Sequence, residues 1–121
     1  MPVAQNYAIQ GLPATLPEYL AAKELNKLGI DYEFQSSFMG GRTQTGGVVA
    51  DFYLREHNLI LSVRGEYWHH LPGRSFQDMI QRLALISQGI QTIFIDEADI
   101  LRNPAFYVAE ALKGNDYSNS N

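Results

Sequence analysis

The sequence is 121 residues long and 45% apolar, with 10 Gly, 5 Pro and no Cys. This composition is typical of one globular domain, and it excludes thiol catalysis, thiolate metal sites and most multidomain architectures. No apolar run reaches the roughly 18 residues that a membrane span needs, and the N-terminus lacks the basic start and apolar stretch of a signal peptide. We therefore expect a soluble, cytoplasmic protein that has no membrane partner.

The net charge of −4 argues against attraction of nucleic acid by the surface as a whole. The charges are unevenly distributed, however. Residues 42–82 carry five Arg, four acidic residues and all three His, whereas the remainder carries four basic and nine acidic residues. If the protein binds a polyanion such as DNA, we expect it to bind at this middle stretch, through Arg42, Arg64 and Arg74.

The first part of the chain predicts one helix after a loose arm over residues 1–14. Thr15 and Glu18 have the spacing of a capping box, in which each satisfies the other's backbone N–H. Gly29 stands where a helix would end. These signals predict a helix over residues 16–28, with Glu18 at its start.

Three strands are predicted next, as residues 30–37, 48–54 and 59–64, by alternating or continuous apolar patterns. The glycine-rich segment 40–47 before the second strand is equally typical of a flexible hairpin tip and of a loop that clamps a substrate. The four residues 55–58 between the last two strands suit an antiparallel hairpin.

A register in which Leu54 faces Leu59 has consequences for the polar residues of this hairpin. It places Asp51 opposite Ser62 and Val49 opposite Arg64. Because side chains alternate along a strand, Asp51, Ser62 and Arg64 then share one face of the sheet.

The rest of the chain predicts a helix that starts at Ser75 and ends at Gly89, a strand over residues 91–95 parallel to its sheet partner, and a helical turn over 96–101. A last helix is expected from Pro104 to near Gly114, followed by a disordered tail over 115–121. The order α-β-β-β-α-β-α predicts an α/β fold, a mixed β-sheet core flanked by helices on both faces, as a single domain over residues 15–114.

Asp51 is the first candidate for chemistry because a carboxylate in the middle of an apolar strand must be paired, protonated or bound to a cation, unless it points to solvent. Arg64 could bind a phosphate or form a structural bridge to Asp51 or Glu66. His69 could transfer a proton, or it could pack beneath the neighbouring Trp68. Glu18 already has a structural role in the capping box.

Two blocks of the sequence resemble a known family. Residues 47–54, Gly-Val-Val-Ala-Asp-Phe-Tyr-Leu, and residues 63–70, Val-Arg-Gly-Glu-Tyr-Trp-His-His, resemble the core of the very-short-patch repair endonucleases. These belong to the restriction-endonuclease-like, PD-(D/E)XK superfamily of small nucleases. Residues 89–97 and 99–104 fit the same pattern, in which a strand runs into a final helix, and the resemblance covers about residues 15–113.

The resemblance implies a restriction-endonuclease-like fold and Mg²⁺-dependent (or Mn²⁺-dependent) cleavage of DNA phosphodiester bonds. Asp51 would be the metal-binding aspartate, and the backbone carbonyl of Val63 would be a second metal ligand. His69 would take part in the chemistry, and Glu18 stands where many members of the family carry an acid on the first helix.

The sequence also departs from the pattern of the wider superfamily. Ser62 stands in place of its second acid and Arg64 in place of its lysine. In the very-short-patch branch the second acid is also missing. The cysteines that bind structural zinc in the repair enzymes have no counterpart here.

The first hypothesis is therefore a small Mg²⁺-dependent DNA endonuclease or nickase. In this hypothesis Asp51 and Val63 hold the ion that activates water, and Arg64 steadies the phosphate. Glu66 or Glu18 adds a ligand through water, and Arg42 follows the DNA backbone.

The alternative is a catalytically inactive protein of the same fold that serves as a structural or interaction module of a phage or mobile element, in which case it would be virion-associated. A third hypothesis is a nuclease-like subunit that needs a protein partner. A homodimer is also compatible with the resemblance, because many relatives cut duplexes as dimers.

Overall fold

The computed structural model of the protein describes residues 7–38, 48–65 and 83–118. The elements follow one another in the order β1 (Tyr7–Ile9), β2 (Leu12–Ala14), α1 (Leu16–Lys27), β3 (Glu33–Phe38), β4 (Val48–Leu54), the 3₁₀ turn η2 (Arg55–His57), β5 (Leu59–Arg64), β6 (Gln91–Asp96), α3 (Glu97–Arg102) and α4 (Pro104–Leu112). Residues 83–86 are also helical. Among the described residues, no helix is long and apolar enough to cross a membrane.

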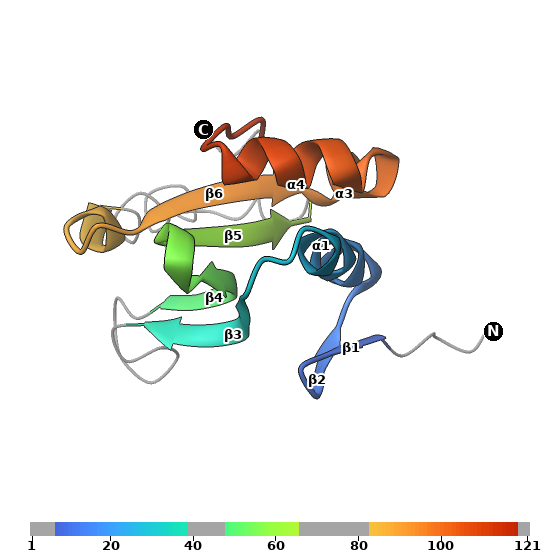
Figure 1. Ribbon diagram of the computed structural model, residues 1–121, viewed down its shortest axis with the longest axis horizontal. Helices are drawn as coiled ribbons and strands as arrows, with labels where there is room; N and C mark the ends of the chain where they lie inside the picture. Colours follow the sequence, from blue (N-terminus) through green and yellow to red (C-terminus); the bar gives the residue numbers. More distant parts are fainter. Residues whose placement is uncertain (1–6, 39–47, 66–82, 119–121) are drawn as a thin grey trace.

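The centre of the fold is a mixed four-stranded sheet with the order β3-β4-β5-β6 (Figure 1). β4 pairs antiparallel with both β3 and β5, and β6 runs parallel to β5. The predicted mixed sheet and the parallel pairing of its last strand are therefore confirmed. The predicted register is also confirmed, because Leu54 pairs with Leu59.

Helices cover both faces of this sheet, as the sequence predicted. Alternate residues of β5 point to opposite faces. Leu61 belongs to the larger core, together with residues of α1, α3 and α4, whereas its neighbour Ile60 packs with Leu85 of the helical stretch 83–86. The larger core also contains Phe52 of β4, which is completely buried.

Helix α1 forms as the sequence predicted. Thr15 accepts a hydrogen bond from the backbone N–H of Glu18, and the Glu18 carboxylate accepts one from the backbone N–H of Thr15. Leu28 is the C-terminal cap, and Gly29 follows with a φ of +69°, a conformation that glycine adopts at little cost. The capping box fixes the position of Glu18 at one end of the sheet.

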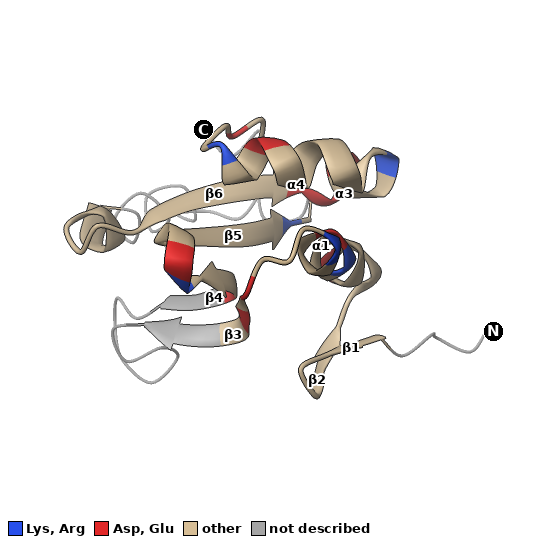
Figure 2. Ribbon diagram, viewed as in Figure 1, with Lys and Arg blue, Asp and Glu red and all other residues tan. Residues whose placement is uncertain are grey.

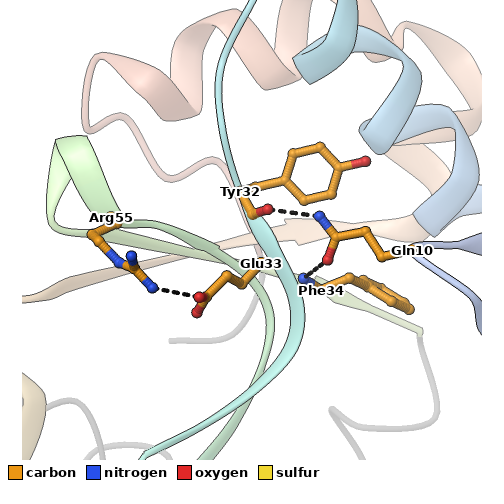
Figure 3. Close-up of polar contacts among 5 residues, drawn as sticks. All are labelled: Gln10, Tyr32, Glu33, Phe34 and Arg55. Carbon is orange, nitrogen blue, oxygen red and sulfur yellow. Dashed lines mark hydrogen bonds and ion pairs between the residues drawn. The ribbon is translucent and has the colours of Figure 1, made fainter.

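The prediction of a loose N-terminal arm is wrong for residues 7–14, which form the β1–β2 hairpin. Its two-residue turn has positive φ at both Gln10 and Gly11, and Ile9 is buried in the larger core. The side chain of Gln10 anchors the hairpin to β3. It donates to the carbonyl of Tyr32 at 2.7 Å and accepts from the N–H of Phe34 at 2.8 Å (Figure 3).

The C-terminal tail is also ordered further than predicted, because residues 115–118 pack against the outer edge of β6. Asp116 accepts the backbone N–H of Phe94 at 2.9 Å, and Ser118 is buried. Within the described part of the chain, a side chain rather than a neighbouring strand accepts this N–H of β6, which the polar composition of the tail gave no reason to expect.

The remaining differences concern boundaries. The strand predicted over 30–37 spans Glu33–Phe38, and the helical turn predicted over 96–101 is helix α3, Glu97–Arg102. The predicted glycine-rich loop at 40–47 and the start of the helix predicted from Ser75 lie outside the described residues.

Candidate active site

The candidate site lies where β4 and β5 separate. Within the described residues the paired positions of these strands end with Phe52 and Leu61, one residue short of Asp51. The Asp51 carboxylate turns toward β5 instead. Its Oδ2 accepts the backbone N–H of Val63 at 2.8 Å and lies 3.5 Å from the hydroxyl of Ser62. Asp51 therefore faces Ser62 as the sequence predicted, but the pairing of Val49 with Arg64 is not part of this ladder.

The backbone carbonyl of Val63 points to the same side of β5 as its N–H, because both polar groups of one strand residue point toward the same neighbour. The N–H of Val63 points toward the Asp51 carboxylate. The carbonyl of Val63 therefore also faces the gap that opens between β4 and β5. None of the described residues donates a hydrogen bond to Oδ1 of Asp51. An acidic oxygen and a peptide oxygen thus face one gap.

Arg64 lies on the same sheet face as Ser62, as predicted, and its guanidinium stacks on a ring. Its Nε donates to Ser62 Oγ at 3.3 Å, and its guanidinium carbon lies 4.2 Å from the centroid of the Phe94 ring. Phe94 is the register partner of Ser62 on β6. The guanidinium is thus oriented by a hydroxyl and by an aromatic ring.

Burial raises the pKa of Asp51 from 3.8 to about 6, and it is the largest of the effects on this group. The hydrogen bond from Val63 opposes this shift, the negative charge of Glu18 adds to it, and the positive charge of Arg64 lowers the pKa again. Asp51 is thus a poorly solvated carboxylate with an acidic neighbour on α1. Both conditions favour binding of a cation over the bare ionised form.

Glu97, which no sequence pattern pointed to, lies at the same end of the sheet. Arg64 is in register with Asp96, the last residue of β6, so the first residue of α3 comes beside the end of β5. A Cβ atom at Gly65 would lie only 2.8 Å from Oε1 of Glu97. The signal that would have found it is an acid that directly follows a strand predicted to be parallel to β5.

Figure 2 shows where the charged residues lie along the ribbon. Basic colour at the end of β5 lies near acidic colour at the junction of β6 and α3, and the end of α1 lies close by. Among the described residues, no group of three or more His, Cys, Asp and Glu side chains is arranged to hold a metal ion.

The structure thus brings Glu18, Asp51, Ser62, Val63 and Arg64 together. The other residues that the sequence selected lie outside the described part of the chain, and their roles stay predictions. They are Arg42, Glu66, His69 and Arg74.

Comparison with known proteins agrees with this architecture. The fold is of the mixed α/β class. The solved structure of the "Homing Endonuclease I-Bth0305I Catalytic Domain" is similar to this chain with a TM-score of 0.63 and 23% sequence identity. The match covers 83% of this chain and 93% of that chain, which establishes the shared fold. No protein-family description and no curated protein matches the sequence.

Proposed function

We propose that this protein is a metal-dependent DNA endonuclease or nickase of the PD-(D/E)XK superfamily, close to the very-short-patch repair endonucleases. The observation that carries the proposal is the position of Asp51. In a fold similar to that of a homing endonuclease catalytic domain, it is the carboxylate at the split between two central strands, where it bonds to the backbone of Val63.

The oxygen donors at this split fit Mg²⁺, or Mn²⁺ in its place. Mg²⁺ prefers carboxylate and carbonyl oxygens, keeps several waters and is often held by only one or two carboxylates. Oδ1 of Asp51 and the carbonyl of Val63 would hold the ion. When bound, the ion would polarise the phosphodiester and activate water for hydrolysis.

The side chains around Asp51 support binding of a phosphate. Arg64 would bind the phosphate oxygens, because its guanidinium is oriented by Ser62 and by the Phe94 ring. Glu18 would hold water beside the ion, since its charge already acts on Asp51. In the same proposal His69 moves a proton, Glu66 adds a ligand through water, and Arg42 and Arg74 contact the DNA backbone.

The proposal is tested by a nicking assay on supercoiled and branched DNA with Mg²⁺ and with Mn²⁺. We expect Asp51→Ala to lower the rate at least about a hundredfold, since it removes the only side-chain ligand proposed for the ion. Asp116→Ala is the matched control, because this carboxylate also accepts a strand N–H but lies at the outer edge of β6. Nicking by the Asp51→Ala protein at the wild-type rate would contradict the proposal.

The alternative is an inactive nuclease-fold module, and it rests on Ser62 and Arg64, which stand where the superfamily has an acid and a lysine. Calorimetric titration with Mn²⁺ separates the two functions. Binding that is lost in Asp51→Ala and kept in Asp116→Ala supports the enzyme. A folded wild-type protein that binds no Mn²⁺ supports the inactive module.

A further inference from the structure

Arg64 and Phe94 are in contact across two neighbouring strands. Ser62 of β5 is in register with Phe94 of β6, so their side chains leave the sheet on the same face, which Arg64 shares two residues further along β5. Nε of Arg64 donates to Ser62 Oγ at 3.3 Å, and the guanidinium carbon lies 4.2 Å from the centroid of the Phe94 ring. One flat group thus makes two contacts of different kinds.

These two contacts restrict the plane of the guanidinium. The hydrogen bond to Ser62 fixes the direction of Nε–H, and the ring of Phe94 lies against the group. Because a guanidinium is planar and its donors form a rigid fork, a contact that fixes the plane also fixes the directions of the donors. A lysine at position 64 would keep the positive charge. Its ammonium group, however, has no plane that a ring and a hydroxyl could fix.

The Phe94 ring is a firm support for this contact. Phe94 is only 4% exposed, and it lies in the middle of β6. Its strand is paired with β5 on one side, and its N–H is accepted by Asp116. A ring that is shielded from water attracts a cation more strongly than an exposed ring does. Phe94 therefore forms the rigid side of the contact, and the long, half-buried side chain of Arg64 forms the flexible side.

The contact lies directly beside the candidate active site. The Ser62 hydroxyl that accepts the Arg64 Nε–H lies 3.5 Å from Oδ2 of Asp51. One small side chain thus adjoins both the guanidinium and the carboxylate. Any change in the plane of the guanidinium therefore alters the arrangement of charge next to Asp51.

We propose that Phe94 is a positioning residue: its ring, together with the Ser62 hydroxyl, holds the Arg64 guanidinium in one plane, so that the site requires arginine at position 64 and not simply a positive charge. This inference deepens the proposed function, and the part that concerns phosphate binding rests on that function. The restriction of the guanidinium does not.

The test is a double-mutant cycle of Phe94→Leu and Arg64→Lys. Ile93→Val is the matched control, because Ile93 is buried on the same strand but belongs to the core on the opposite face of the sheet. One readout is the NMR order parameter of the Arg64 Nε–H bond in protein without metal, which measures how firmly the group is held. The other is the rate of nicking of supercoiled DNA with Mg²⁺.

We expect Phe94→Leu to lower the order parameter and to slow nicking about tenfold, since a shielded contact between a cation and a ring is lost. Arg64→Lys should slow nicking by a similar factor although it keeps the charge. The double variant should be about as slow as the slower single variant, because both changes remove the same oriented group. Ile93→Val should stay close to the wild type in both readouts. If Phe94→Leu does not fold, Phe94→Met, which has a more similar volume, replaces it.

Three results would overturn the inference. An unchanged order parameter in the folded Phe94 variant would show that the ring does not restrict the guanidinium. Nicking by Arg64→Lys at the wild-type rate would show that charge alone is enough. Losses that multiply in the double variant would show that Phe94 acts on nicking by another route. A wild-type protein that does not nick DNA contradicts the proposed function alone, because the order parameter still tests the contact.

Discussion

Two carboxylates in this protein each accept a hydrogen bond from a strand N–H, and they differ in the hydrogen bonds that their second oxygen accepts. Asp51 accepts the N–H of Val63 at 2.8 Å, and Asp116 accepts the N–H of Phe94 at 2.9 Å. The second oxygen of Asp116 is used, since Oδ1 accepts hydrogen bonds from both the backbone and the hydroxyl of Ser118. Oδ1 of Asp51 receives no hydrogen bond from the described residues.

The comparison shows why one acid is structural and the other is a candidate for chemistry. Asp116 closes the outer edge of β6 with both oxygens, so its charge is largely satisfied within the protein. Asp51 lies between strands, where burial raises its pKa to about 6 and one oxygen faces the gap. A half-buried and incompletely satisfied carboxylate is destabilising by itself, and a bound cation would relieve that cost.

The largest expected effect comes from neutralising Asp51. A raised pKa means that the folded state binds the proton more tightly than the unfolded state does. The contribution of this proton to the unfolding free energy is therefore fully present below pH 4 and is lost as pH rises through 6. Asp51→Asn removes this loss. In EDTA its unfolding free energy should equal that of the wild type near pH 4 and exceed it by up to about 3 kcal/mol at pH 7.5. Urea unfolding at several pH values measures the difference.

The same variant should bind Mn²⁺ much more weakly, so stability and function change in opposite directions. A wild-type protein that is as stable as Asp51→Asn at pH 7.5 would show that the Asp51 carboxylate is well solvated, contrary to its burial between the strands.

Removing the Asp116 carboxylate should lower the unfolding free energy, and by less than Asp51→Asn raises it. Asp116→Ala leaves the buried N–H of Phe94 without its acceptor and should lower the unfolding free energy by about 1–3 kcal/mol. Asp116→Asn, which keeps an acceptor oxygen, should lose less. Urea unfolding measures both variants, and Mn²⁺ binding should be unchanged in each. Weaker Mn²⁺ binding in Asp116→Ala would contradict the division of roles between the two acids.

At the opposite edge of the sheet, a neutral side chain makes hydrogen bonds to the backbone. Gln10 bonds to Phe34 on β3 and to Tyr32, the residue just before that strand (Figure 3). Gln10→Ala should lower the unfolding free energy by about 1 kcal/mol, because water replaces these bonds at a partly exposed edge. Gln10→Asn tolerates the left-handed turn but is too short to reach β3, so it should cost about the same. Thermal unfolding of the two variants, with no change in nicking, checks this prediction.

The smallest effect is expected from the exposed ion pair between Arg55 and Glu33, which is also drawn in Figure 3. Both side chains are largely solvated, so Arg55→Ala should change the unfolding free energy by less than about 1 kcal/mol, and less still at high salt. Urea unfolding at low and high ionic strength tests it. A larger loss of unfolding free energy would mean that this ion pair stabilises the protein more than the hydrogen bonds of Gln10 do.

Much of the fold could be predicted because its signals are local. The capping box of Thr15 and Glu18, the alternation along β4 and β5, and the four-residue connection between them each lie within a short segment. The register of that hairpin follows from these local signals, and it is enough to place Asp51 opposite Ser62. The β1–β2 hairpin was missed because Gln-Gly is a weaker turn signal than Asn-Gly or Asp-Gly.

The parts of the site that escaped prediction depend on residues distant in sequence. Glu97 reaches Gly65 only through the parallel pairing of β5 with β6, and the Asp116 contact depends on which strand becomes the outer edge.

The sequence by itself determined which residues form the helix start, the central hairpin and the shared face of Asp51, Ser62 and Arg64, because hydrogen-bond spacing and side-chain alternation act over a few residues. Only the tertiary structure decided that β4 separates from β5 at Asp51 and that Glu18 lies near enough to act on it. The reason is that the pKa of a carboxylate depends on how much solvent and which charges surround it in space. Those surroundings include α1 and β5, which are far apart in the sequence.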